Sequence, residues 1–342
     1  MPSDDVLERV ERKNLRRRLV LLILAVGLLA VFILSLFAGR YPEPGFISWS
    51  RLVNDDLALR LFLHLRLPRL VTAFLLGATL AAAGTVFQFL FGNPLVEPGF
   101  LGVSQGAAFG AALSIVLSSG TALITQASAA FFAMLGLGFS YLLARRLRYG
   151  GWILRLVLAG IAVSAFFSAG LGLLKIMADP LNQLQEITFW LLGSLASITW
   201  RQVLPVLPFV LAGLLVVHLY RWRLNLLALD EQTSFSLGVT PGRERWLLIL
   251  ATVLPVAALI AVTGMVGWVG LIMPHVSRRL LGTDTRFCVP ASMLLGGGFT
   301  MLCDDLARNL LAGEIPLGIL TSLFGAIIFL FLLMFQKAKV KQ

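Results

Sequence analysis

The chain has 342 residues, of which 58% are hydrophobic and only 13% are charged, and its mean hydropathy is +0.90. Several nearly uncharged segments reach the roughly 20 residues that a helix needs to cross a bilayer. This composition excludes a soluble domain with a single anchor and predicts an all-α polytopic membrane protein. The net charge of +11 does not indicate a nucleic-acid partner, because no long basic run is interleaved with aromatic residues.

Residues 1–18 are polar and basic, and an apolar run from Leu19 to Ala38 follows them. We expect a cytoplasmic N-terminal tail and then the first membrane span. A cleaved signal peptide is the competing interpretation, but the run is long for the apolar region of such a peptide and has no clear A-x-A cleavage site. Residues 39–69 are mixed in character, which predicts an external segment with a short amphipathic helix lying on the membrane.

Nine further apolar runs are expected to cross the membrane in alternating directions. They are residues 70–90, 100–117, 122–144, 153–176, 203–220, 247–266, 267–282, 287–308 and 316–335. Residues 187–198 are too few to span and are expected to be re-entrant or interfacial. A transmembrane domain over residues 19–336 would then hold about ten helices, and residues 337–342 would form a cytoplasmic tail.

The distribution of basic residues supports this orientation. Most of the 28 lysines and arginines fall in segments assigned to the inside, whereas the acidic residues divide almost evenly between the two sides. Only basic residues are expected to follow such a bias in a membrane protein. Both chain termini are therefore predicted to be cytoplasmic.

The two cysteines, Cys288 and Cys303, lie in one expected span, which would place them about 22 Å apart along its axis. This distance is too long for a disulfide. No phosphate-binding G-x-x-x-x-G-K-[ST] motif occurs, and the three histidines are scattered. We therefore expect no catalytic residues, no metal site and no cofactor in this chain.

The stretch LFGNPLVEPGFLG, residues 90–102, breaks an apolar helix near the inner side of the membrane. Irregular backbone at membrane depth is tolerated only where protein or water covers it. Asn93, Pro94 and Leu95 could form a simple tight loop between two spans, or a gate on a transport pathway.

Two further groups of residues indicate contacts with partners. Arg66, Arg69 and Arg308 lie at the outer ends of two spans, where they could reach the membrane interface or form a basic patch that docks an acidic partner. On the inner side, the segment at about residues 221–246 mixes acidic residues with apolar residues that need a cover in water. The residues expected to dock a cytoplasmic partner are Leu226, Leu227, Leu229, Asp230, Glu231, Phe235, Leu237 and Gly238.

Two long motifs stand out in this sequence. The first is LHLRLPRLVTAFLLGATLAAAGTVFQFLFGNPLVEPGFLGVSQGAAFGAAL, and the second is GMVGWVGLIMPHVSRRLLGTDTR. They are followed by P-x-S-x-L-L-G-G, DDLAR and EIPLGILTSLFGA. Together these motifs resemble the FecCD-type permeases of ABC importers, and the resemblance covers about residues 60–335.

The resemblance implies a cobalamin-importer-like permease fold with ten spans, some of them short or broken. It also implies a dimer of this chain with itself or a close paralogue, two cytoplasmic ATPase subunits that bind the ATP, and a periplasmic or extracellular substrate-binding protein. The expected location is the bacterial inner membrane. The expected cargo is an iron–siderophore complex, haem or cobalamin, among which the sequence does not choose.

By the same resemblance, Arg66, Arg69 and Arg308 would grip glutamates of the binding protein. Asn93, Pro94 and Leu95 would form the cytoplasmic gate, and residues 226–242 would be the coupling helices in the ATPase cleft. Ile327 replaces a proline that the family usually carries, which predicts a straighter last helix.

Two other classes of protein compete with the importer. A secondary transporter driven by an ion gradient would need acidic residues in the middle of its spans, and the acidic residues near the spans lie close to their ends. An intramembrane enzyme would need a convergent catalytic set, which the sequence lacks.

Overall fold

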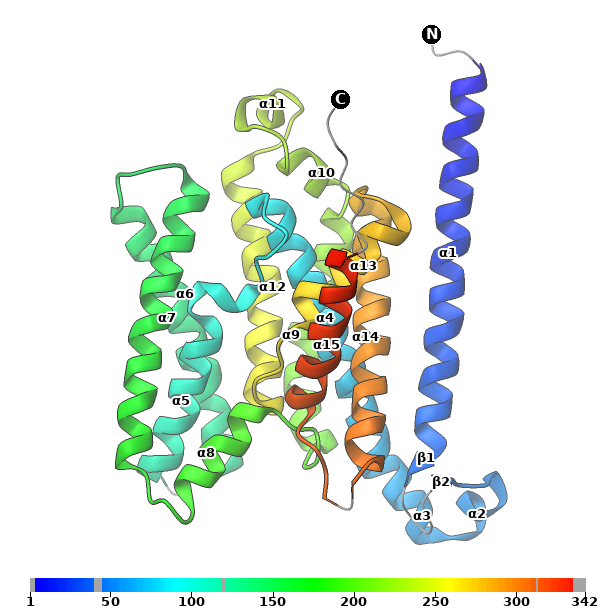
Figure 1. Ribbon diagram of the computed structural model, residues 1–342, viewed down its shortest axis with the longest axis vertical. Coiled ribbons are helices and arrows are strands. Elements are labelled where there is room, and N and C mark those ends of the chain that lie inside the picture. Colours follow the sequence, from blue (N-terminus) through cyan, green and yellow to red (C-terminus); the bar gives the residue numbers. More distant parts are fainter. Residues whose placement is uncertain (1–3, 40–44, 119–120, 312, 335–342) are drawn as a thin grey trace.

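The structure is a computed structural model that describes residues 4–39, 45–118, 121–311 and 313–334. These residues form a bundle of helices, most of which run along the long axis of the molecule (Figure 1). The strands in this part of the chain are limited to the two-residue pair β1 (Ala38–Gly39) and β2 (Gly45–Phe46), which pair antiparallel.

Each of the ten expected spans corresponds to a helix. They are α1 (Asp4–Phe37), α4 (Leu67–Phe91), α5 (Val103–Ser118), α6 (Ala122–Arg146), α7 (Trp152–Met177), α9 (Trp200–Tyr220), α12 (Pro241–Thr263), α13 (Val269–Leu281), α14 (Thr285–Asn309) and α15 (Leu317–Met334). Within the described residues, 8 helices are long and apolar enough to cross a membrane, whereas α5 and α13 have 16 and 13 residues. The prediction of an all-helical polytopic membrane protein with short helices is confirmed.

Short helices connect the spans. They are α2 (Trp49–Asn54), α3 (Asp56–Leu61), the π-helical turn η1 (Phe62–Arg66), the 3₁₀ turn η2 (Pro98–Leu101), α8 (Gln183–Leu192), α10 (Arg223–Leu227) and α11 (Glu231–Ser236). The second span begins earlier than expected, because α3, η1 and α4 form one helical stretch from Asp56 to Phe91. The Asp55 side chain caps its start by accepting hydrogen bonds from the backbone N–H groups of Leu57 and Ala58.

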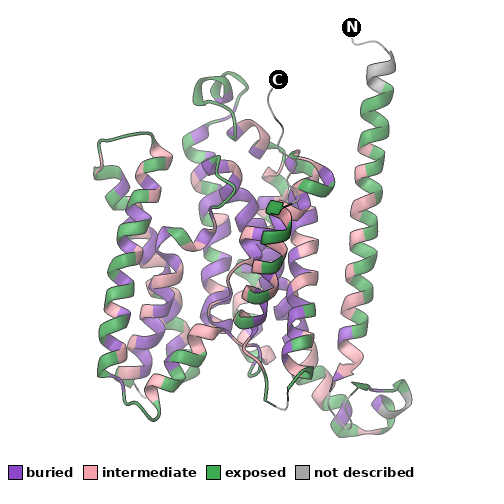
Figure 2. Cartoon of the chain, viewed as in Figure 1, coloured by how far each residue is buried: buried purple, intermediate pink, exposed green. Residues whose placement is uncertain are grey.

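Helix α1 stands at the edge of the bundle (Figure 1). Residues 4–18, expected as a polar tail, continue the same helix as the first span. In the most apolar 18-residue segment of this helix only 6% of the residues are buried, so most of its surface is available to lipid (Figure 2). The helix packs mainly against α14, with fewer contacts to α4.

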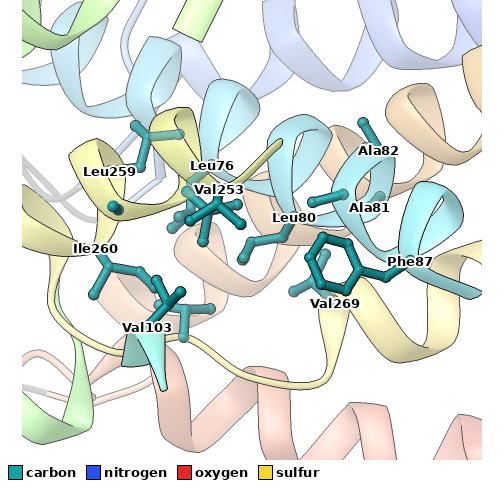
Figure 3. Close-up of a cluster of buried hydrophobic side chains, with 14 of the residues drawn as sticks. Leu76, Leu80, Ala81, Ala82, Phe87, Val103, Val253, Leu259, Ile260 and Val269 are labelled. Carbon is teal, nitrogen blue, oxygen red and sulfur yellow. The ribbon is translucent and has the colours of Figure 1, made fainter. Parts of the chain in front are cut away.

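Helix α4 forms the centre of the fold. In the most apolar 18-residue segment of the helical stretch Asp56–Phe91, 89% of the residues are buried. Its Leu76 and Leu80 pack with Val253 of α12 and Val269 of α13 in a continuous apolar core (Figure 3). Burial on all sides explains why its apolar residues show no helical periodicity, since a helix buried all round needs no polar face.

Small residues let other helices approach α4 closely. A Cβ atom on Gly84 would overlap the carbonyl oxygen of Gly270 in α13, and one on Gly77 would overlap that of Gly296 in α14. Contact of backbone with backbone is the usual role of glycine between membrane helices. The glycines that appear at short intervals in the sequence therefore set the spacing of the helices around α4.

The later half of the chain contains breaks between its helices. Residues 264–268 link α12 to α13 without helical structure, and Trp268 has a φ of 72°. This link lies against the end of α8, where the Ser194 N–H donates to the Thr263 carbonyl at 2.8 Å. The Leu317 N–H donates to the Gly193 carbonyl at 2.8 Å and joins the start of α15 to the same place. Helix α15 continues through Ile327 without a break.

Candidate functional site

The three arginines expected to dock a partner lie together at the end of the bundle opposite the start of α1. They line one cavity of about 250 Å³ with Gly39, Leu61, Leu65, Ala196, Asn309 and Glu314. Arg66 ends η1, Arg69 lies in the first turn of α4, and Arg308 lies in the last turn of α14. The structure thus brings the three predicted side chains together at one end of the bundle.

The Arg69 side chain is bound inside the protein. Its guanidinium donates to Asp304 at 2.9 and 3.0 Å and to Glu314 at 2.9 Å. The side chain of Asp304 is 1% exposed and that of Arg69 is 11% exposed, whereas that of Glu314 is 38% exposed. The positive charge of Arg69 is thus balanced within the chain, where it ties α4 to α14 and to the segment before α15.

Arg308 forms a second tie at the same end. Its guanidinium contacts the carboxylate of Asp305 and donates to the Ser35 carbonyl of α1 at 2.7 Å. The Ser35 hydroxyl in turn donates to Asp305. Only 10% of the Arg308 side chain is exposed, so this arginine joins α14 to α1.

Arg66 contacts the end of α1 and β1. Its guanidinium lies beside Gly39 and makes a long hydrogen bond of 3.5 Å to the Leu36 carbonyl.

The break after α4 is a compact turn. Gly92 ends the helix with a φ of 59°, and the Asn93 side chain accepts a hydrogen bond of 2.9 Å from the Leu95 N–H. Asn93, Pro94 and Leu95 are all exposed, and 52% of Leu95 is accessible. The turn presents Leu95 away from the core.

The loop containing Leu95 lines a cavity of about 640 Å³. Its other walls come from η2, the end of α8, the 264–268 link, α13 and the first turns of α15. The lining side chains are Leu95, Glu97, Phe100, Leu191, Leu192, Met265, Trp268, Leu271, Ile319 and Ser322, with the backbone of Gly267 and Gly318. The break at residues 92–102, the end of α8 and the 264–268 link thus meet at this cavity.

Glu97 is the charged residue of this cavity. It also lines a neighbouring cavity of about 230 Å³, and among the described residues no other ionisable side chain lines either cavity. Phe100, Met265 and Gly267 are likewise shared by the two cavities. Sequence analysis missed Glu97, although an acidic residue between two prolines beside a membrane span was a signal that could have found it.

The expected coupling segment forms a small lobe at the same end of the bundle as the start of α1 (Figure 1). Leu229, Phe235 and Leu237 are exposed, at 43%, 69% and 54%, whereas Leu227 is only 1% exposed and Leu226 is partly buried. The apolar residues of this segment therefore divide into a buried base and an exposed surface.

Polar contacts define the start and end of α11. The Asp230 carboxylate accepts from the Thr233 N–H at 2.9 Å, which caps the helix and holds the pKa of Asp230 below its usual value. Glu231 lies in the first turn, and Gly238 follows the helix with a φ of 79°. The exposed positions at Phe235 and Leu237 thus have a defined backbone.

The lobe is fixed to the membrane helices. The Asn225 side chain donates to Asp284 at 3.1 Å and accepts from the Thr285 N–H at 3.0 Å, which anchors α10 to the start of α14. Arg223 pairs with Glu244 of α12. A displacement of α10 and α11 would therefore act directly on α12 and α14.

Within the described ranges 4–39, 45–118, 121–311 and 313–334, no three His, Cys, Asp or Glu residues lie close enough to hold a metal ion. Cys288 and Cys303 both lie on α14, are buried and form no disulfide. These side chains fill the core.

Comparison with known proteins identifies the family. The profile described as the FecCD transport family matches residues 27–335. The chain belongs to this family. It is the permease subunit of an ABC importer and is not itself an enzyme, which decides against the ion-gradient transporter and the intramembrane enzyme.

Relatives are similar over nearly their whole length. A molybdate import system permease of Haemophilus influenzae is 39% identical, with 90% of this chain and 92% of that protein covered. A hemin transport system permease of Yersinia pestis is 35% identical, with 92% and 96% covered. A vitamin B12 import system permease of Vibrio cholerae is 37% identical, with 91% and 92% covered.

A solved structure supports the fold. An inward-facing structure assigned to the metal-chelate type of ABC transporter shares 36% sequence identity with this chain and superposes with a TM-score of 0.85. The match covers 92% of this chain and 98% of that one. As a multi-pass permease of this family, the chain works with ATPase and binding-protein partners.

Proposed function

We propose that this FecCD permease is one half of a dimeric importer that carries a metal chelate from an external binding protein to the cytoplasm. The single observation that carries the proposal is the cavity of about 640 Å³ at which the gate loop and the broken helices meet. Discontinuous membrane helices form the substrate sites of many transporters. A second copy of the chain, placed against this side, would complete the pathway around a twofold axis.

The cargo that best suits this cavity is a bulky chelate: an iron–siderophore complex, haem or cobalamin. The lining is mostly apolar and includes Phe100, Met265 and Trp268, with Glu97 as its charged group. The names of the hemin and vitamin B12 relatives support this class of cargo. Molybdate is a second candidate because of the 39% identical relative, although the cavity offers no cation to hold an oxyanion.

Docking of the binding protein is assigned to the cavity around Arg66. A glutamate of the binding protein can approach this guanidinium as it lies beside Gly39. Arg69 and Arg308 line the same cavity, so all three arginines are assigned to the docking surface. The ion pairs of Arg69 with Asp304 and of Arg308 with Asp305 hold two of these guanidiniums in place.

The turn at Asn93, Pro94 and Leu95 is assigned as the cytoplasmic gate. Leu95 is exposed on the cavity wall, and the side chain of Asn93 holds its backbone in place. In a twofold dimer the two Leu95 side chains would close the inner mouth of the pathway. The short turn can move without disturbing α4, because Gly92 ends that helix.

Coupling to the ATPase subunits is assigned to Leu229, Phe235 and Leu237, the exposed apolar residues of the lobe. Two ATPase subunits would bind the ATP, one under each copy of the permease. Their closure would move α11 and α10, and the contacts of Asn225 with Asp284 and Thr285 would pass the motion to α14. This arrangement puts both chain termini on the cytoplasmic side of a bacterial inner membrane.

The proposal is tested by gentle affinity purification of the tagged chain from its native membranes, with mass identification of the proteins that accompany it. Recovery of an ATPase with a phosphate-binding loop, together with an exported binding protein, is the expected result. The binding protein is then titrated with ferric siderophores, haem, cobalamin and molybdate to identify the cargo. Recovery of the chain without an ATPase from membranes active in uptake would contradict the proposal.

A further inference from the structure

A basic cavity lies between α1 and the bundle, away from the transport pathway. It has a volume of about 370 Å³ and opens among α1, α9 and α14 near the N-terminal half of α1. The lining residues are Asn14, Arg18, Leu21, His218, Arg221, Arg286, Phe287 and Pro290. Three separate helical segments thus contribute an arginine to one cavity, which neither the gate nor the coupling lobe explains.

The positive charges at this place exceed the negative ones. Arg286 and Arg17 both pair with Asp284, at 2.7 and 3.5 Å, so two guanidiniums share one carboxylate. Arg221 donates to the His218 carbonyl at 2.8 Å, which does not balance its charge. Among the described residues, Arg18 forms no ion pair with any carboxylate. Clustered arginines with one shared carboxylate favour an anion in the cavity.

The cavity is also amphipathic. Leu21, Phe287 and Pro290 line it together with the arginines. The adjoining stretch of α1 is apolar, and only 6% of the residues in its most apolar 18-residue segment are buried (Figure 2). Lipid chains can therefore lie beside the cavity. Basic pockets between membrane helices near an interface bind the headgroups of anionic lipids.

We propose that this cavity binds the phosphodiester headgroup of an anionic phospholipid. Arg18, Arg221 and Arg286 contact the phosphate oxygens, for which the flat guanidinium is well suited because it donates two parallel hydrogen bonds. One acyl chain follows Leu21 and Phe287 along the groove between α1 and α14. The lipid thereby joins α1 to α9, with which α1 makes few contacts.

The experiment is native mass spectrometry of the full-length purified chain, titrated with phosphatidylglycerol or phosphatidylcholine. We expect preferential retention of phosphatidylglycerol and about fivefold weaker retention in Arg18→Gln, as expected for the loss of one basic side chain near an anionic headgroup. The matched control is Arg16→Gln, an exposed position on the same helix outside the cavity lining. Arg18→Lys is expected to keep most of the binding.

Three results would overturn the proposal. The first is equal retention of the two lipids by the unmodified chain, and the second is equal losses in Arg18→Gln and Arg16→Gln. The third separates a lipid from a small anion: millimolar inorganic phosphate that displaces phosphatidylglycerol completely would show a site for free phosphate. Arg18 is exposed, so the variant is expected to fold, and its thermal unfolding in detergent verifies this.

Discussion

Arg69 of α4 and Asp304 of α14 form a bidentate ion pair at 2.9 to 3.0 Å, although 235 positions separate them in the sequence. Glu314 accepts from the remaining side of the same guanidinium at 2.9 Å. The pair lies where α4 begins and α14 ends, so it fixes the two helices of the core to one another beside the cavity that contains Arg66.

Removal of Asp304 should strongly destabilise the protein. Asp304→Ala leaves the buried Arg69 guanidinium with only the half-exposed Glu314, and loss of one partner of a buried pair costs about 3–5 kcal/mol. Thermal or denaturant unfolding of the purified chain in detergent measures the effect. The exposed pair of Arg60 with Asp56, at 3.9 Å, provides the control, because Asp56→Ala should change stability by less than about 1 kcal/mol. Equal stability of the two variants would disprove the structural role of Asp304.

Charge reversal at Arg66 should weaken docking of the binding protein. Arg66→Glu replaces the attraction for an acidic partner by repulsion, and we expect an affinity about tenfold lower at low salt. The control is Arg60→Glu, which makes the same change at an exposed residue on the same helical stretch. Arg69→Glu is a poor test because it would also break the pair with Asp304. Unchanged affinity of Arg66→Glu at low salt would eliminate this docking site.

Substitution of the exposed apolar residues of the lobe should uncouple the ATPase without unfolding the permease. Phe235→Ala removes a side chain that is 69% exposed, so stability should be unchanged. If this side chain anchors the interface, affinity for the ATPase subunits should fall about tenfold or more. Leu227→Ala is the contrasting variant, since this residue is 1% exposed and its loss should cost about 2–5 kcal/mol of stability. Normal ATPase binding and coupling by Phe235→Ala would remove the coupling role from this surface.

The predicted spans and the observed helices agree because long apolar runs are local signals. Residues 122–144 and 153–176 were expected to span, and α6 (Ala122–Arg146) and α7 (Trp152–Met177) match them closely. Residues 39–69 were expected to include a short amphipathic helix on the membrane, and the structure continues the helix that begins at Asp56 directly into α4. Hydropathy alone does not show whether such a helix is separate from the span that follows it.

The candidate site was predicted in part. The arginines at this end of the bundle could be recognised as a group, but the burial of Arg69 depends on Asp304 and Glu314, which are far away in sequence and meet it only in the folded bundle. Likewise, Leu227 and Leu229 are two positions apart, and packing of α10 against α4 determines that one is buried and the other exposed. Spacing in the sequence carries no signal for such contacts.

The gate turn should control transport through its own geometry. Asn93→Ala removes the acceptor for the Leu95 N–H, so the turn should loosen and ATP hydrolysis should continue with reduced transport. Asn93→Asp retains an acceptor at this position and should preserve coupling. The measurement is the ratio of cargo imported to ATP hydrolysed in reconstituted vesicles. The same ratio in Asn93→Ala, Leu95→Ala and the unmodified chain would rule out a gate at this turn.

Reconstitution of the permease with its ATPase and binding protein tests the central claim most directly. Labelled metal chelate is supplied with the binding protein on one side of a proteoliposome, and ATP is supplied on the side of the ATPase. The account predicts accumulation of the chelate that requires both hydrolysable ATP and the binding protein and that persists after an uncoupler is added. Accumulation driven by an ion gradient in the absence of ATP would contradict it.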